Sequence, residues 1–134
     1  MPVMGRPSWR SAAPWILAAP IAIAVLMIAL QVFIRIEART AGDRAAAQFG
    51  GDRVSGLIGL VDCGGCSLRD RDRAVWALGE LRDERALPVL KTHYTGGKCD
   101  HTAALCQYEL GKAIMKIEGT WNPRSANLFR RSRP

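Results

Sequence analysis

Four cysteines are the residues of this 134-residue chain whose types and spacing best suit chemistry: Cys63, Cys66, Cys99 and Cys106. Their thiol groups can form structural disulfides, bind zinc as thiolates or carry out thiol–disulfide exchange. All four follow a long apolar stretch near the N-terminus. An even number of cysteines in a small exported domain favours disulfides, whereas a cytosolic location favours metal or redox roles. The side of a membrane on which these residues lie therefore decides their interpretation.

Structural disulfides are the first interpretation, and they leave the pairing open. Four cysteines allow three connectivities. Pairing Cys63 with Cys66 and Cys99 with Cys106 keeps both bonds local, and each bond would stabilise the fold by about 2–3 kcal/mol on the chain-entropy model. A bond between the two cysteine-containing loops would instead connect two parts of the domain and stabilise it more.

A zinc site is the second interpretation. The Cys63-x2-Cys66 spacing is typical of zinc ligands, and Cys99 with Cys106 or His101 would complete a tetrahedral set. Thiolate binding would also supply folding free energy. The spacing of Cys99 and Cys106 is not typical of zinc, so we expect no metal unless the domain faces the cytosol.

Redox catalysis is the third interpretation. The C-x-x-C motif at residues 63–66 can lower the pKa of a thiol. A thioredoxin-like function needs a βαβ context, which this sequence does not contain. Ser67 stands where a C-x-x-C-H haem attachment site requires histidine. We also find no nucleophile–base pair in the sequence, and we therefore expect no catalytic residue, no cofactor and no enzymatic activity.

An apolar stretch at residues 15–34 precedes the four cysteines and contains no charged side chain. As a helix, these residues would be about 30 Å long, which is the thickness of the hydrocarbon core of a bilayer. We expect one transmembrane helix after a disordered lead over residues 1–14, with the lipid bilayer as a partner. A cleaved signal peptide is disfavoured because its apolar region usually has about 7–15 residues, and no A-x-A cleavage site directly follows the stretch.

The net charge of +7 is concentrated at the two ends of the chain. Six of the nineteen basic residues lie there, and the other thirteen nearly balance the twelve acidic residues. These six are Arg6, Arg10, Arg124, Arg130, Arg131 and Arg133. Anionic lipid is therefore a more natural partner than nucleic acid, for which the sequence has no stacking pattern or fold signature.

The orientation of the span is weakly encoded because basic residues lie on both sides of it. A span with a very short N-terminal lead is usually inserted with its N-terminus in the cytoplasm. The cysteines agree with an exported domain. We expect a single-pass membrane protein with a cytoplasmic N-terminus and its folded domain on the exported, periplasmic side.

Four helical patterns fill residues 52–119, where apolar residues recur at intervals of three and four. Each pattern begins near a residue that can cap a helix: Asp52, Asp70, Asp83, and Asp100 or Thr102. Pro88 fits poorly inside the third helix, because proline lacks a backbone donor, unless that helix begins late. On the fourth helix, Cys106 is expected on the apolar face and Gln107 on the opposite, polar face.

Two further segments flank this domain. Residues 35–51 are expected to continue the span as a juxtamembrane stalk that is interrupted near Gly42 and ended by two glycines. Residues 120–134 form a basic tail that we expect to be disordered.

An internal repeat relates the first two helical patterns to the last two. The tetrapeptide at residues 57–60 matches that at 87–90, and Ala-Leu-Gly at 77–79 matches Glu-Leu-Gly at 109–111. Two copies of one helix–loop–helix unit can bury their apolar faces by stacking on each other. Three or more repeats are usually needed for independent stability, so the cysteines are candidates for the missing stabilisation.

The sequence RAVWALGELRDERALPVL at residues 73–90 resembles the short bacterial HEAT-like repeat of the type named after phycobilisome lyases, with Pro88 where that family commonly has proline. The chain also resembles small bacterial membrane-anchored HEAT-repeat proteins of unassigned role. That resemblance rests on Tyr-Thr-Gly at 94–96, Cys-Asp-His at 99–101 and Leu-Cys-Gln at 105–107. It implies a helical scaffold, and no lyase residue can be matched.

Together these features predict an all-α protein with one N-terminal transmembrane helix and a short α-hairpin repeat domain of about four helices over residues 52–119. We expect a membrane-anchored scaffold that binds another protein around Trp76, Tyr94 or the charged edge of the helix at 70–81. A membrane-tethered thiol–disulfide or zinc-binding protein that uses Cys63 and Cys66 is the alternative.

Overall fold

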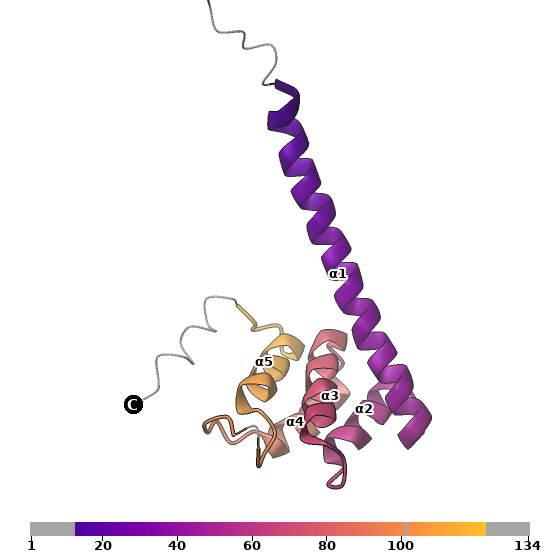
Figure 1. The fold of residues 1–134 in the computed structure, drawn as a ribbon. Helices are drawn as coiled ribbons and strands as arrows, with labels where there is room; N and C mark the ends of the chain where they lie inside the picture. The colour runs from indigo at the N-terminus through magenta and orange to yellow at the C-terminus, as the bar shows by residue number, and fades with distance from the viewer. Residues whose placement is uncertain (1–12, 101, 123–134) are drawn as a thin grey trace, which may run out of the picture. The chain divides into compact units, whose positions relative to one another are not determined.

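A computed structural model of the chain describes residues 13–100 and 102–122. Within these residues the regular elements are helices, and no strand is present (Figure 1). The elements are α1 (Ala13–Phe49), α2 (Arg53–Asp62), α3 (Leu68–Leu81), the 3-10 helix η1 (Glu84–Ala86), α4 (Leu87–His93) and α5 (Gln107–Ile117). The predicted all-α class is confirmed. The chain divides into two compact units, Met1–Phe33 and Ile34–Pro134, which are described separately.

In the first unit, α1 carries large apolar side chains on all sides. Those of residues 21–33 are about half exposed or more, including Ile21, Leu26, Ile28 and Phe33. A helix that is apolar all round needs an apolar environment, because exposing this surface to water is unfavourable. The segment Ala18–Phe49 is long and apolar enough to cross a membrane, and a signal sequence near the N-terminus would have the same properties.

In the second unit, the C-terminal part of α1 packs against α2. Ala38 and Ala45 are almost completely buried. A Cβ added at Gly56 of α2 would lie 2.4 Å from the backbone nitrogen of Ala46, so the two helices cross in backbone contact. The helix also continues through Gly42, so the expected interruption there is wrong. The stalk expected over residues 35–51 thus contributes a helical layer to the folded domain, which the sequence expectation did not include.

Helix α3 lies between α2 and α5 and packs against both (Figure 1). Six large side chains are fully buried in the core around it: Leu57, Val61, Val75, Leu78, Leu90 and Leu110. A Cβ added at Gly79 would lie 2.9 Å from the Cα of Ala113, so α3 and α5 also approach closely. The two glycines matched by the internal repeat are both buried: Gly79 faces α5, and Gly111 is covered by the Tyr94 ring.

The helix starts follow local capping chemistry. Asp52 caps α2 as expected, since its carboxylate accepts a hydrogen bond from the Ser55 backbone N–H at 3.0 Å. The cap of α3 is Ser67, whose hydroxyl oxygen accepts from the Asp70 N–H at 3.1 Å. Asp70 therefore lies in the first turn, where its negative charge is favourable.

The second helical pair begins later than the sequence pattern suggested. Asp83 caps η1, and α4 starts at Leu87, so Pro88 lies in its first turn, where no backbone donor is required. Helix α5 starts at Gln107 with Cys106 as its N-cap residue. The expected cap by Asp100 or Thr102 is wrong, because the Asp100 carboxylate accepts from the Thr102 N–H at 2.9 Å within the preceding loop.

Candidate functional site

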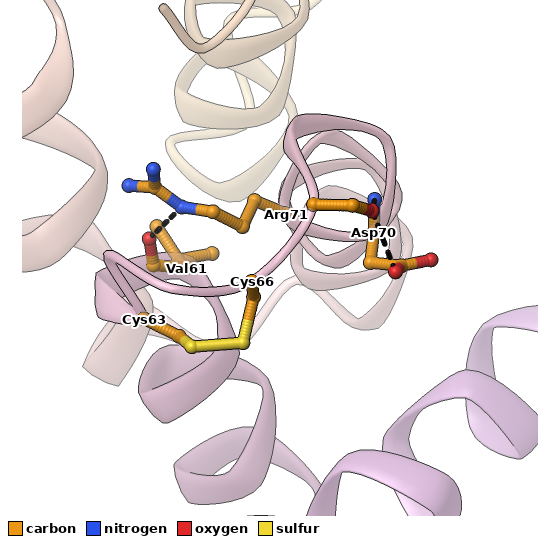
Figure 2. Close-up of a disulfide and its surroundings, with 6 residues drawn as sticks. Val61, Cys63, Cys66, Asp70 and Arg71 are labelled. Carbon is orange, nitrogen blue, oxygen red and sulfur yellow. Dashed lines mark hydrogen bonds between the residues drawn. A yellow bond between two sulfur atoms is a disulfide. The ribbon is translucent and has the colours of Figure 1, made fainter.

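The loop between α2 and α3 contains a disulfide between Cys63 and Cys66 (Figure 2). Their Cα atoms are 5.4 Å apart, and the Cys66 N–H donates to the Cys63 carbonyl at 3.3 Å. Side chains added at Gly64 or Gly65 would meet no other atom within 4 Å, so the two glycines leave this loop open to solvent. One of the two local pairings considered from the sequence is therefore present.

Two side chains at the start of α3 hold this loop in place. The Arg71 Nε donates to the carbonyl of Val61 at 2.8 Å, which satisfies an acceptor near the C-terminal end of α2 (Figure 2). The Ser67 hydroxyl donates to the Asp70 carboxylate at 2.6 Å. Arg71 and Asp72, on the charged edge of α3, therefore bond to neighbouring elements.

Cys99 and Cys106 form a second pair at the start of α5. Their Sγ atoms are 2.8 Å apart, and both are thiols. Cys99 is exposed and Cys106 is buried. The backbone N–H of Tyr108 donates to the Cys99 Sγ at 3.2 Å, and the Cys106 N–H donates to a carboxylate oxygen of Asp72 at 2.9 Å. Burial, together with the adjacent Cys99, raises the pKa of the Cys106 thiol to about 11.

Gln107 is buried, contrary to its expected position on the polar face of α5. It was expected to face away from the domain, but only 9% of its surface is exposed. Its Oε1 accepts from the Thr95 N–H at 2.7 Å, and its Nε2 donates to the carbonyl of His93 at 3.2 Å. Because α5 starts at Gln107 itself, this side chain lies in the first turn and reaches back to the end of α4.

The predicted zinc set is not assembled among the residues that the structure describes. Cys63 is bonded to Cys66, and Cys99 adjoins Cys106. Over residues 13–100 and 102–122, no group of three or more His, Cys, Asp or Glu side chains is placed to hold a metal ion. His101, the remaining candidate ligand, lies outside the described residues.

Trp76 and Tyr94, the candidate interaction residues, are both partly buried against the core. The Tyr94 ring covers Gly111, where an added Cβ would lie 3.2 Å from its Cε2 atom. Trp76 continues the outward surface of α3, because Arg69 and Arg73 precede it at i−7 and i−3 and are exposed. We call these three residues, Arg69, Arg73 and Trp76, the α3 outer face.

A groove adjoins the α3 outer face. It lies between the C-terminal part of α1, helix α2, the disulfide loop and α3. Its lining combines apolar side chains such as Leu57 and Leu60 with the charged side chains of Arg44, Asp70 and Arg73. Such a mixed surface suits a partner that presents apolar and charged groups together.

In a comparison with known families, the PBS lyase HEAT-like repeat matches residues 70–94. This segment contains most of α3 together with η1 and α4. Comparison with curated proteins and with solved structures finds no match. The resemblance to a HEAT-like repeat is thus confirmed for residues 70–94, and a repeat of this kind suggests a protein-interaction module.

Proposed function

We propose that this protein is a non-catalytic scaffold, held at a membrane by α1, whose HEAT-like helices bind another protein. The observation that carries the proposal is the HEAT-like match over residues 70–94, combined with the exposed side chains that α3 presents along one face. Repeat helices of this type offer extended binding surfaces. The apolar part of α1 supports attachment to a bilayer.

The partner is proposed to dock on the α3 outer face and the adjoining groove. Arg69 supplies an exposed positive charge there, and Trp76 supplies an aromatic surface. Arg73 lies between them and is paired with the Glu37 carboxylate of α1 at 3.3 Å. Arginine and tryptophan are the residue types that most often dominate binding energy at protein interfaces. Tyr94 contributes indirectly, because its ring packs on Gly111 and helps to position α5 against the end of α4.

Site-specific photocrosslinking in native membranes tests this docking surface. A photoreactive amino acid at Arg69 should give a discrete protein adduct, and Arg73→Glu in the same chain should reduce it strongly. The same amino acid at Thr92, which is exposed on α4, serves as the matched control. Equal adducts at both positions, or an Arg69 adduct unaffected by Arg73→Glu, would contradict docking on this face.

We further propose that the N-terminus lies on the cytoplasmic side of the membrane and that the helical domain lies on the exported side. The Cys63–Cys66 disulfide supports this orientation, because structural disulfides persist mainly in oxidising compartments. A membrane-impermeant thiol reagent, applied to intact cells after mild reduction, should label the exposed Cys99. Labelling that requires permeabilised membranes would reverse the proposed orientation while leaving the docking proposal open to its own test.

A further inference from the structure

The segment that joins α4 to α5 is held at both ends near the Cys99–Cys106 pair. At one end, Gln107 accepts from Thr95 N–H at 2.7 Å and donates to the His93 carbonyl. At the other end, the Cys106 N–H is bonded to Asp72 of α3 at 2.9 Å. The surrounding structure therefore fixes the buried thiol independently of any bond to Cys99.

The exposed thiol is held toward the buried one. The Cys99 Sγ accepts a hydrogen bond from the Tyr108 N–H at 3.2 Å, in the first turn of α5. The two sulfur atoms are 2.8 Å apart. A disulfide has a bond length of about 2.0 Å, so the sulfur atoms need to approach by less than about 1 Å to become bonded.

We propose that Cys99 and Cys106 are a dithiol site that closes a second disulfide by exchange with an external disulfide, which is either a protein disulfide oxidant or glutathione disulfide. Closure would fasten Cys99 covalently to Cys106, the residue that precedes α5. This dithiol site is independent of the protein that docks on α3. Its redox reaction uses Cys99 and Cys106, which are separate from the Cys63–Cys66 disulfide.

The different solvent exposure of Cys99 and Cys106 sets the order of the two thiol–disulfide exchange steps. The Cys99 thiolate attacks the external disulfide, forms a mixed disulfide with one half and releases the other half as a thiolate. The Cys106 thiol then loses its proton to solvent, and its thiolate attacks the Cys99 Sγ and displaces the second half. Two electrons pass from the protein dithiol to the external disulfide, which leaves as two thiols after taking up two protons.

The difference between the two thiols supports this order. Cys99 is exposed, whereas only 5% of the surface of Cys106 is accessible. The pKa of Cys106, raised mainly by burial, also leaves little of this thiol ionised at neutral pH, which disfavours it as the group that attacks first. A large external disulfide can therefore reach Cys99 first, and Cys106 acts as the resolving thiol.

The test uses the full chain in detergent micelles, fully reduced and then exposed to a glutathione disulfide buffer. Alkylation of free thiols and peptide mass analysis identify the products. Wild type should yield a Cys99–Cys106 disulfide. Cys106→Ser should instead accumulate glutathione on Cys99, at least about tenfold above wild type, because intramolecular resolution is faster than attack by a second molecule. Cys99→Ser should leave Cys106 unmodified.

Two outcomes would overturn the proposal. One is a wild-type chain in which Cys99 carries glutathione and Cys106 stays a free thiol. The other is a bond from Cys99 to Cys63 or Cys66, which would show that the local pairing is not preferred. Cys106→Ala provides a second resolving-thiol variant if serine disturbs folding, and it should trap the same adduct.

Discussion

Gly56→Ala tests the closest helix crossing in the folded domain. A Cβ at this position would lie 2.4 Å from the Ala46 nitrogen and 2.6 Å from the Ala45 carbonyl carbon. An ordinary contact begins at 3.4 Å, so α2 would have to move from α1 by about 1 Å. Neither neighbour can yield by changing a rotamer, because both contacts involve backbone atoms.

The expected change in unfolding free energy follows from two opposing effects. Overpacking in a well-packed core costs about 1–3 kcal/mol, and backbone contacts favour the upper part of this range. Alanine is favoured over glycine inside a helix by about 1 kcal/mol. The net destabilisation is therefore about 2 kcal/mol, which corresponds to a urea midpoint lowered by about 1 M for a small domain.

The assay is urea unfolding of the full chain in detergent micelles, followed by far-ultraviolet circular dichroism. Gly59→Ala on the same helix is the matched control. Its Cβ would lie 3.1 Å from the Phe49 Cβ, which is only about 0.3 Å inside ordinary contact, and Phe49 is the exposed last residue of α1, where a small shift is easily accommodated. The control should be neutral or slightly more stable than wild type. If Gly56→Ala matched Gly59→Ala, the backbone crossing at Gly56 would be refuted.

Three further substitutions address other parts of the domain. Gln107→Leu should destabilise it by about 1–3 kcal/mol and speed hydrogen exchange at the Thr95 amide, because that N–H loses its acceptor. Leu78→Ala should cost about 2–5 kcal/mol in urea unfolding, because this side chain is fully buried. Asp52→Asn should destabilise the domain at neutral pH by an amount that shrinks on acidification. Hydrogen bonding from the Arg85 guanidinium, followed by that from Ser55, holds the pKa of Asp52 well below 3.8, so this stabilisation is present above pH 3.8 and is lost as the pH falls below it.

Controls and contradicting results differ among the three. For Gln107→Leu, the Gln107→Glu variant keeps the acceptor for Thr95, and equal exchange in both variants would argue against the hydrogen bond. A Leu78→Ala midpoint equal to wild type would show that this position is not in the core. For Asp52→Asn, a stability difference that does not change between neutral and strongly acidic pH would rule out the ionised Asp52–Arg85 contact as its source.

The sequence predicted the helical class because apolar periodicity and glycine punctuation are local signals. Asp52 and Asp83 cap helical turns as expected, since an N-cap depends on a few neighbouring residues. Pro88 fits the structure because α4 starts at Leu87, so that no backbone donor is required of it. The predicted start of α5 was wrong because Asp100 makes a cap-like hydrogen bond within a loop turn that does not continue into a helix.

The candidate site was predictable only in part. The sequence offered the Cys63–Cys66 and Cys99–Cys106 pairing as one of three connectivities, and local geometry brings the members of each pair together. The role of Gln107 could not be predicted, because it depends on where α4 ends and α5 begins. The ties of Asp72 to Cys106 and of Arg71 to Val61 join separate elements, so no local pattern encodes them.

The sequence by itself determined an apolar helix long enough to cross a membrane, a helical repeat and two closely spaced pairs of cysteines. These follow from composition, periodicity and short spacing, which act within one or two turns. Only the tertiary structure decided that the residues after the apolar segment pack against α2 at Gly56. It alone decided which charged residues of α3 point outward and that one thiol of the second pair is buried. Those features depend on contacts between helices distant in the chain, where side-chain volume and burial decide the arrangement.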